Sequence, residues 1–390
     1  MEHFRAAERA LVSALVLGNA DRLELSGRLR ESDFTDPAAA VLFRVAMDAE
    51  RPIAAADLPA ALQRQGLLRR DGYPLSELLD WLPRLPVPVH PEAWATLIVA
   101  GTVGRQVNAA GVRLLQAVDI GREGTWPVGK VLAMASAQRA SLASGFHRWE
   151  DLPAKWRDTM PCLPVPDSAA AERSVPEHVA EVSEAELARG AGRERVLLAG
   201  LVAAPQLLGR IPWLRDEDFT DPACGSVFEA VRRVHERGGA VDVVTLPALC
   251  DGSQRGWSGQ SPSEVARALR PDAAVPTTVP FLSRMVLGDA LLRGVERAGR
   301  ELVALAEAPA SAGGVGSGLM TAAQTRLEVL RPFATRWEEA TRPSRMIDLT
   351  RHPGLERTRA LERSTPLERS ATSDRFMTAD LRSGLNRDAG

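Results

Sequence analysis

The sequence predicts an all-α protein built from two tandem helical-bundle modules, each with a C-terminal antiparallel helical hairpin, and a disordered tail. A block of six identical residues, Asp-Phe-Thr-Asp-Pro-Ala, occurs at 33–38 and again at 218–223, and such internal similarity indicates a duplicated module. Apolar residues recur at helical spacing in both halves, without a convincing run of alternating strand residues. From about Ala340 onward, this periodicity ends.

The chain has 390 residues, and at roughly 150 residues per domain we expect two such units. Apolar residues make up 45% and charged residues 25% of the sequence, which is ordinary for a soluble globular protein. The formal net charge of -2 gives no overall attraction for a polyanion. Bulk charge therefore argues against a DNA-coating role.

The cysteines and the hydropathy pattern predict the cellular compartment of the protein. Cys162, Cys224 and Cys250 lie far apart, so they fit neither a disulfide framework nor a zinc knuckle. No apolar run is long enough to span a membrane, and the first residues lack the regions of a secretory signal. We therefore expect a cytoplasmic protein with no membrane partner.

The similarity between the two copies continues on both sides of the six-residue block. Upstream, Glu8-Arg9 precedes an apolar run in the first copy, as Glu194-Arg195 does in the second. Downstream, Asp57-Leu58-Pro59-Ala60 corresponds to Thr245-Leu246-Pro247-Ala248. Several matches in one order are better explained by duplication than by chance.

Each repeated block is predicted to begin a helix. Asp36 and Asp221 are each followed by a proline, Pro37 and Pro222. An aspartate at the N-cap accepts hydrogen bonds from the free N–H groups of the first turn, and proline fits the first helical position because its missing N–H costs nothing there. Helix capping therefore explains these aspartates better than acid–base chemistry does.

Four phenylalanines are predicted to lie in the two cores. Phe34 and Phe219 precede the caps by two residues, close to the position from which an apolar side chain fixes the entry of the chain into a helix. Phe43 and Phe228 lie near the middle of the helices that follow. Asp33 and Asp218 stand directly before Phe34 and Phe219, and we assign these two carboxylates to the same local capping structure.

Helical periodicity continues through both copies. In the first helix, Leu11, Ala14, Leu15 and Gly18 share a face. A short third helix is predicted from Asp57 to before Gly66, and its counterpart from Thr245 to near Gly252. After proline-rich turns at Pro83 to Pro91 and Pro271 to Pro280, a long amphipathic helix leads to a glycine-rich break and a return helix. The breaks lie at Gly121 to Gly129 and Gly313 to Gly318, and the return helices at Val131 to Leu142 and Leu319 to Leu330.

These features give four predicted segments: residues 1–145 form copy 1, 146–191 a proline-rich linker, 192–338 copy 2, and 339–390 the disordered tail. The tail carries an acid–base pair every six residues, at Glu356-Arg357, Glu362-Arg363, Glu368-Arg369 and Asp374-Arg375. A six-residue period matches neither helix nor strand, and few apolar residues stand between the pairs. Folding of the tail on a partner is the alternative.

The order of these features resembles the N-terminal domain of DnaB-type replicative helicases. The residues that carry the resemblance are Glu8-Arg9, Asp33-Phe34, Phe43, Gly66 with Asp71-Gly72, Pro83 to Pro91 and the hairpin around Arg105, and then Glu194-Arg195, Asp218-Phe219, Phe228, Gly252, Pro271 to Pro280 and the hairpin around Arg293. It covers roughly Met1 to Gly145 and Gly192 to Trp337.

The resemblance implies a domain without catalytic activity. In the helicases this domain forms a collar through hairpin pairing and contacts primase and helicase loaders. The family often has Gly-Gly after its third helix, where copy 1 has Asp71-Gly72 and copy 2 has no such pair around Gly252 to Trp257. The RecA-like motor that follows the domain in the helicases has no counterpart in this sequence.

One stretch has the spacing of a phosphate-binding loop: Gly124-Thr125-Trp126-Pro127-Val128-Gly129-Lys130. However, Val131 replaces the Ser or Thr that would ligate Mg²⁺, and Pro127 removes one backbone donor. The preceding residues are also predicted to be helical, whereas a phosphate-binding loop follows a strand. We therefore expect the turn of a helical hairpin, with NTP hydrolysis through Lys130 as a weak alternative.

No other pattern predicts catalytic, cofactor-binding or metal-binding residues, because the histidines never fall at ligand spacing and no nucleophile motif occurs. Arg293, Arg297 and Arg300 are expected on one side of the second hairpin, with Arg105 near the corresponding place in the first. A solvated face is the simplest interpretation of these arginines. A face for an acidic protein or for DNA phosphates is the alternative.

We therefore expect a replication adaptor or regulator that binds the replicative helicase, its primase or a loader. Direct DNA binding through the hairpin arginines is the second hypothesis. Homo-oligomers through the helical hairpins are a further expectation, since the two copies could pair inside one chain or with another chain.

Overall fold

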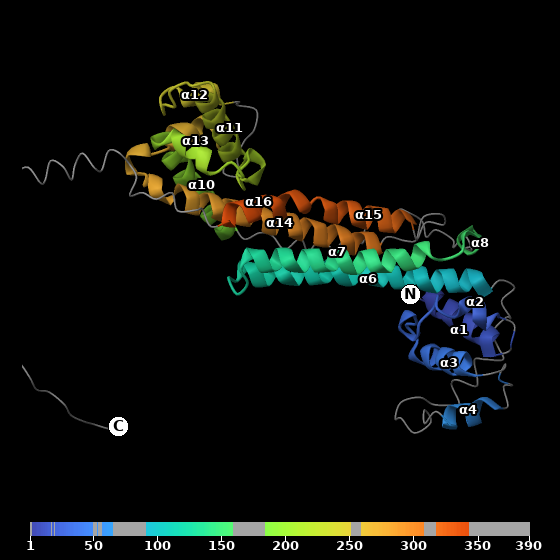
Figure 1. The fold of residues 1–390 in the computed structure, drawn as a ribbon. Helices are drawn as coiled ribbons and strands as arrows, with labels where there is room; N and C mark the ends of the chain where they lie inside the picture. The colour runs from blue at the N-terminus through green and yellow to red at the C-terminus, as the bar shows by residue number, and fades with distance from the viewer. Residues whose placement is uncertain are drawn as a thin grey trace, which may run out of the picture. The chain divides into compact units, whose positions relative to one another are not determined.

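The computed structural model describes residues 2–16, 18, 20–49, 53, 57–64, 91–158, 184–250, 259–307 and 317–342. These ranges contain helices and no β-strand (Figure 1), which confirms the all-α prediction. Some predicted features lie outside the described residues. They are the end of the short helix at Gly66, Asp71-Gly72, most of the first proline-rich turn, Gly252, most of the glycine-rich break at Gly313 to Gly318, most of the linker and all but the first residues of the tail.

The first copy begins with a group of short helices, here called head 1 (residues 2–64). Its elements are α1 (Glu2–Val16), α2 (Arg22–Leu25), the 3-10 helix η1 (Glu31–Asp33), α3 (Pro37–Asp48) and α4 (Leu58–Arg64). Leu11, Ala14 and Leu15 are buried on one face of α1 as predicted. Gly18 does not share that face, because it lies beyond the end of α1 with a φ of 77°, a conformation that favours glycine after a helix.

Hairpin 1 follows head 1 and consists of α6 (Pro91–Arg122) and α7 (Val128–Glu150). The predicted return helix, Val131 to Leu142, is longer at both ends. Phe146 and Trp149 near the end of α7, and Trp156 in α8 (Ala154–Asp158), are buried in the same core as head 1. The boundary expected at residue 145 therefore falls inside α7, and residues 146–158 pack as part of copy 1.

The second copy begins with head 2 (residues 184–278). Its elements are α10 (Glu184–Ala203), η5 (Pro205–Arg210), η6 (Asp216–Asp218), α11 (Pro222–Glu236), α12 (Leu246–Leu249), α13 (Pro262–Ala268), η7 (Pro271–Ala273) and η8 (Pro276–Thr278). Helix α13 was not among the predicted helices, although Ser261 and Glu264 form a capping box around Pro262 at its start. That pattern is a helix-start signal visible in the sequence alone.

Hairpin 2 consists of α14 (Val279–Glu307), α15 (Ser317–Glu328) and α16 (Arg331–Thr341). The return helix predicted to end at Leu330 is thus followed by a further helix, which begins one residue before Pro332. Proline is tolerated in the first turn of a helix but interrupts a helix that is already running. Ala340 near the end of α16 is buried in the core of head 2, so the predicted tail boundary at residue 339 falls inside this helix.

The two repeated blocks form the predicted caps in both heads. Asp36 Oδ1 accepts a hydrogen bond from the Ala38 N–H at 2.9 Å, and Asp221 Oδ1 accepts one from the Ala223 N–H at 3.0 Å. Pro37 and Pro222 are the first residues of α3 and α11. The prediction of helix starts at these positions is confirmed.

The predicted core aromatics also pack in the same way in the two heads. The ring centroids of Phe34 and Phe43 lie 4.8 Å apart, and those of Phe219 and Phe228 lie 5.1 Å apart. All four side chains are buried. Each pair joins the segment before a capped helix to the middle of that helix.

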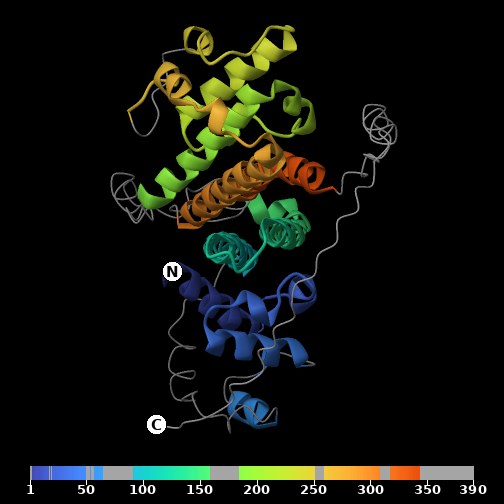
Figure 2. The same ribbon diagram turned by 90° about the vertical axis from the view of Figure 1, so that its left-hand side faces the viewer.

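The two hairpins pack side by side as a bundle of long helices, seen along their length in Figure 1 and nearly end-on in Figure 2. α6 and α14 form its centre and run antiparallel, since Gly111 lies against Gly299 while Gly121, further along α6, lies against Leu292, earlier in α14. Gly111 and Gly299 are equivalent positions, because each follows the corresponding Arg105 or Arg293 by six residues. The copies therefore pair through equivalent surfaces within one chain.

Candidate functional site

Asp33 ties head 1 to both helices of hairpin 1. Its carboxylate accepts bonds from Arg148 of α7, with Oδ1 at 2.9 Å from Nη1 and Oδ2 at 2.6 Å from Nη2, and from the Arg30 N–H at 2.7 Å. The Asp33 carbonyl accepts a bond from Arg105 of α6 at 2.5 Å. The Asp33 side chain is fully buried. Its charge is therefore balanced by the Arg148 guanidinium rather than by water.

Head 2 builds the same arrangement around Asp218. Arg336 of α16 donates to Asp218 Oδ2 at 2.7 Å, and the Arg215 N–H donates to the same oxygen at 2.8 Å. Arg293 of α14 donates to the Asp218 carbonyl at 2.6 Å and to Thr220 Oγ1 at 2.5 Å. Each copy thus uses one aspartate and two arginines to fix its head on its hairpin.

The two ion pairs differ in how completely they are satisfied. Arg148 contacts both oxygens of Asp33, whereas Asp218 Oδ1 and Arg336 Nε are buried without a hydrogen-bond partner among the described residues. Burial raises the pKa of Asp218, against the hydrogen bond from Arg215 and the positive charge of Arg336. Head 2 therefore holds its buried charges at a greater energetic cost.

A second carboxylate stabilises the turn before each capped helix. Glu8 accepts bonds from the N–H groups of Thr35 and Asp36, at 2.8 and 2.7 Å. Glu194 accepts the equivalent bonds from Thr220 and Asp221, at 2.5 and 3.1 Å. Both glutamates are buried, which gives the repeated Glu-Arg dipeptides a structural role.

Burial shifts the pKa values of several charged groups. It raises the pKa of Glu194, although the two backbone hydrogen bonds and the charge of Arg293 oppose the shift. It lowers the pKa of Arg293 and of Arg105, again against nearby carboxylates. These shifts follow from desolvation in a packed core.

The arginines expected to share one face have different surroundings. Arg105 and Arg293 are turned into the heads by the bonds to Asp33 and Asp218. Arg300 is paired with Glu296 on its own helix, and Arg297 is exposed. As a face for a partner these residues remain a prediction, and of the four only Arg297 is exposed.

Arg148 and Arg336, the arginines that neutralise the buried aspartates, were not among the predicted site residues. A signal for them exists, because the tripeptide Arg-Trp-Glu occurs at 148–150 and again at 336–338. This tripeptide is a short stretch of identical sequence near the end of each hairpin. The tripeptide is short, and the domain boundaries predicted at 145 and 338 placed it at the edge of each copy, so it was not recognised as part of the repeat.

Contacts between the copies include charged pairs across the bundle. Arg122 at the end of α6 donates to Glu296 of α14 at 2.5 Å, with both side chains largely buried. Arg139 of α7 pairs with Glu328 of α15 at 3.2 Å, where both side chains are half-exposed. The first pair specifies the register of the bundle more strongly, because exposed pairs contribute little.

The segment with phosphate-loop spacing is the turn of hairpin 1. Gly124 adopts a φ of 76°, Pro127 precedes the first residue of α7, and the Lys130 ammonium lies 4.3 Å from the centre of the Trp126 ring. A helix, α6, precedes this turn. A phosphate-binding loop would follow a strand, so the geometry supports the hairpin-turn prediction.

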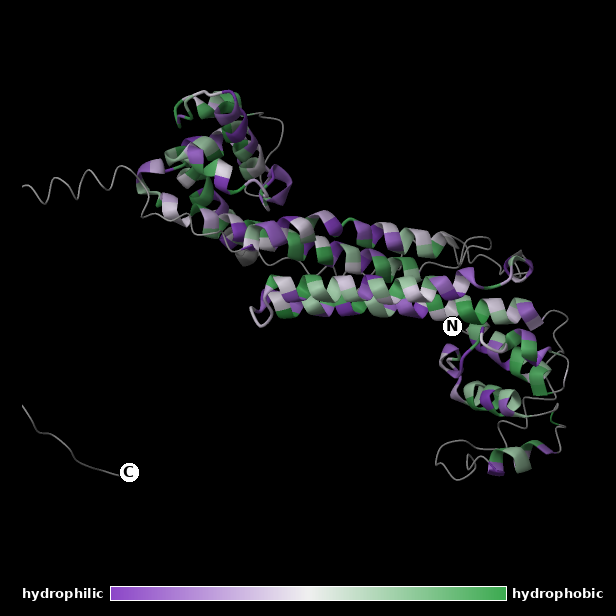
Figure 3. Cartoon of the chain, viewed as in Figure 1, coloured by the Kyte–Doolittle hydropathy of each residue, from purple (hydrophilic) through white to green (hydrophobic). Residues whose placement is uncertain are grey.

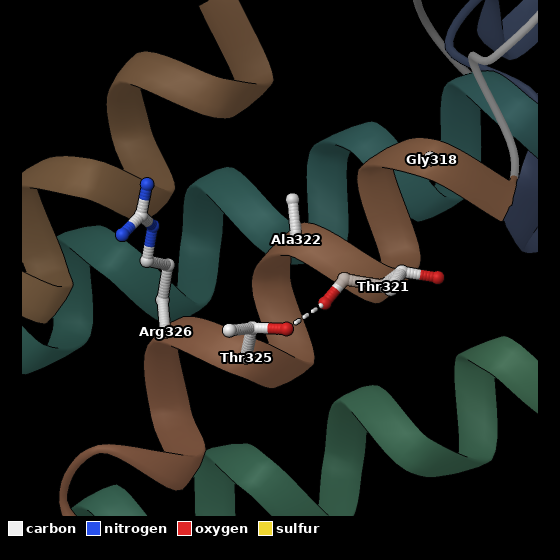
Figure 4. Close-up of a pocket in the computed structure, with 5 residues that line it drawn as sticks. All are labelled: Gly318, Thr321, Ala322, Thr325 and Arg326. Carbon is white, nitrogen blue, oxygen red and sulfur yellow. Dashed lines mark hydrogen bonds between the residues drawn. The ribbon is translucent and has the colours of Figure 1, made fainter.

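A shallow hollow on α15 offers no convergent chemistry (Figure 4). It is lined by Gly318, Thr321, Ala322, Thr325 and Arg326, all from one helix. The Thr325 hydroxyl donates to the Thr321 carbonyl at 2.8 Å, and Arg326 pairs with Glu301 at 3.1 Å. Its polar groups are therefore already engaged.

Two further properties apply to the part of the chain that the structure describes. No group of three or more His, Cys, Asp or Glu side chains is gathered there for a metal ion. None of the described helices combines the length and the apolar character needed to cross a membrane.

Comparison with known families bears on the second copy. Residues 191–260, which run from α10 past α12, match the family described as DnaB-like helicase N terminal domain. Most of head 2 is therefore similar to this family. This domain type is the non-catalytic part of the helicase, so the match gives the chain a helicase-related DNA replication context and indicates helicase-related protein interactions. No curated protein and no solved structure matches the chain.

Head 1 lies outside the matched residues, but it has the same set of contacts. Its Asp33 cluster, its Asp36 cap and its Phe34–Phe43 pair correspond to those of the DnaB-like head 2. The hairpins extend each copy beyond the matched segment.

Proposed function

We propose that the chain is a non-catalytic adaptor or regulator of DNA replication that presents two DnaB-like N-terminal modules to the replicative helicase, its primase or a loader. The observation that carries the proposal is the antiparallel pairing of α6 and α14 around Gly111 and Gly299. One chain thereby resembles a pair of collar domains. It would act in the cytoplasm, by occupying a surface that helicase subunits otherwise use.

The pairing favours binding through the heads. Hairpin surfaces that could join another module are already covered by each other, since Leu291, Leu292 and Val295 of α14 lie in one core with residues of α6 and α7. A partner that docks on the outside of the heads leaves this core intact. A partner that pairs with a hairpin would have to separate the bundle first.

Co-purification of the full-length chain with the replicative helicase, the primase and the loader of its own cell tests the proposal. We expect capture of at least one of them by the wild-type chain. Capture should weaken for Gly111→Ala, which forces α6 and α14 apart, and should be unchanged for Gly104→Ala on the same helix, where an added Cβ meets open space. Failure with all three partners would contradict the proposal.

The DNA-binding alternative has less support. Arg105 and Arg293 donate to backbone carbonyls of the heads, so they are not available to phosphates without unfolding those contacts. DNA binding that is lost in Arg297→Ala and declines steeply with salt would favour it, since phosphate contacts are salt-sensitive.

A further inference from the structure

Head 2 has a shallow groove between α12 and the residues that follow α13. The residues that form its walls and rim include Val243, Val244, Pro247, Ala248, Leu269, Arg267 and Arg270. Hydrophobic residues of α12 are visible at this edge of head 2 in Figure 3. The α12 wall of the groove lies within residues 191–260, which match the DnaB-like family. The wall that follows α13 lies outside them.

Two apolar side chains at the groove are exposed. Val244 is 79% exposed and Leu249, next to the groove at the end of α12, is 49% exposed. In contrast, Leu269 is only 3% exposed and anchors one wall of the groove to the core. Head 1 has one large hydrophobic residue of comparable exposure among its described residues, Leu23. Together with the groove, Val244 and Leu249 offer exposed apolar surface to a partner.

The rim of the groove is positively charged. Arg267 and Arg270 are both exposed, and neither forms an ion pair within the described residues. Asp272 is the one acidic residue of the lining. An occupant with apolar side chains in the centre and carboxylates on its flank would therefore match the groove in both hydropathy and charge.

We propose that this groove binds one amphipathic α-helix of a partner protein, with apolar side chains against Val244 and acidic side chains against Arg267 and Arg270. The occupant is a helix because the described part of head 2 has no strand edge to which an extended peptide could add. This inference rests on the proposed function, since it names how a replication partner docks.

Single-stranded nucleic acid fits the groove less well. Its lining has no aromatic side chain on which a base could stack, and two arginines beside one aspartate give a weak field for a polyanion. If a single-stranded oligonucleotide bound the chain as tightly as an acidic amphipathic peptide does, the choice of a protein helix would be overturned.

The test uses the full-length chain and a labelled synthetic peptide of about 18 residues, with leucines at helical spacing and glutamates on both flanks. Fluorescence anisotropy should show saturable binding that weakens about tenfold or more in the Arg267→Glu, Arg270→Glu double variant. Val244→Asp should weaken binding as well. A peptide of the same composition in scrambled order should bind at least about tenfold more weakly.

The matched control is the Arg210→Glu, Arg237→Glu double variant, because both residues are exposed on head 2, lie outside the groove and change the net charge equally. We expect it to bind the peptide like the wild type. Equal loss in both double variants, or equal binding of the scrambled peptide, would overturn the inference.

Partner capture separates this inference from the proposed function. Suppose that the wild type captures helicase, primase or loader and that the Arg267→Glu, Arg270→Glu variant captures them equally well. The proposed role of the groove is then wrong, and the adaptor function stands. If the peptide binds as expected but no replication protein is captured, the proposed function is wrong and the groove still binds an acidic helix.

Discussion

Head 1 and head 2 use three equivalent positions, one aspartate and two arginines, to attach a head to a hairpin, but only head 1 satisfies its buried ion pair on both carboxylate oxygens. Arg148 contacts both oxygens of Asp33, whereas Arg336 contacts one oxygen of Asp218, and its Nε has no hydrogen-bond partner in the described part of the chain. The two copies of a duplicated module can thus keep the same anchoring residues while these residues contribute differently to stability.

Removal of each arginine is the strongest test of this comparison. Arg148→Met and Arg336→Met each leave a fully buried aspartate without its counter-ion, and such a change costs about 3–5 kcal/mol of unfolding free energy. We expect the larger loss for Arg148, because it makes two bonds to the carboxylate. Urea unfolding followed by circular dichroism measures both.

Arg297→Met is the control for these variants, because Arg297 is exposed and its loss should change the free energy by less than about 0.5 kcal/mol. A greater loss for Arg336 than for Arg148 would contradict the comparison. It would mean that the deeper burial of Arg336, whose side chain is 7% exposed against 19% for Arg148, outweighs the missing bond.

The equivalent glycines at the crossing of α6 and α14 should respond unequally to alanine. A Cβ at Gly111 would lie 2.7 Å from the Gly299 carbonyl oxygen and 3.0 Å from the Val303 nitrogen, and neither backbone atom can move without its helix. We expect Gly111→Ala to cost about 1–3 kcal/mol. Thermal or urea unfolding of the full chain measures the loss.

At Gly299 the added Cβ would lie 3.1 Å from the Gly111 carbonyl oxygen and 3.1 Å from Leu115 Cγ, so smaller shifts relieve the contact. A gain of up to about 1 kcal/mol in helix propensity then brings Gly299→Ala close to neutral. Gly104→Ala, in open space on α6, should be neutral or stabilising. Equal costs at Gly111 and Gly299 would show that the crossing is symmetric.

The smallest expected effect is a pH dependence that comes from Glu194. Burial raises its pKa above the ordinary value of 4.5, so between 4.5 and the raised value the folded state holds this proton more tightly than the unfolded state does. The stability that Glu194 contributes is therefore greatest at low pH and declines as pH rises through this window.

Glu194→Gln removes this titration while it keeps a side-chain oxygen that can accept a backbone hydrogen bond. The unfolding free energy of the wild type minus that of the variant should fall as the pH rises from 4.5 and become constant above the folded pKa. Urea unfolding at a series of pH values measures this difference. A difference that increases with pH would show that the hydrogen bonds from Thr220 and Asp221 dominate over burial.

Local and repeated features of the fold were predictable from the sequence. An Asp-Pro pair specifies a helix start through contacts within two residues, so the caps at Asp36 and Asp221 could be predicted without any tertiary information. The duplicated block predicted two similar heads because identical residues form identical local structures. The turn at Gly124 was predictable for the same reason, since glycine permits its positive φ.

The anchoring ion pairs could not be predicted in the same way. Asp33 and Arg148 are separated by 115 residues, and Asp218 and Arg336 by 118; no local preference links residues so far apart. Each arginine reaches its aspartate only because the return arm of its hairpin, α7 in copy 1 and α15 with α16 in copy 2, leads back to the head. The repeated Arg-Trp-Glu tripeptide indicates that these positions matter but not what they contact.

By itself, the sequence determined that the chain is helical, that it contains one module twice, and where the capped helices begin, because these properties depend on short-range periodicity and local hydrogen bonds. Only the tertiary structure decided that the two hairpins pair with each other at Gly111 and Gly299, that Arg105 and Arg293 face the heads rather than a partner, and that α12 borders a shallow groove with apolar and charged walls. Those properties depend on which distant surfaces bury each other, and helical spacing in a sequence is the same whichever surface is chosen.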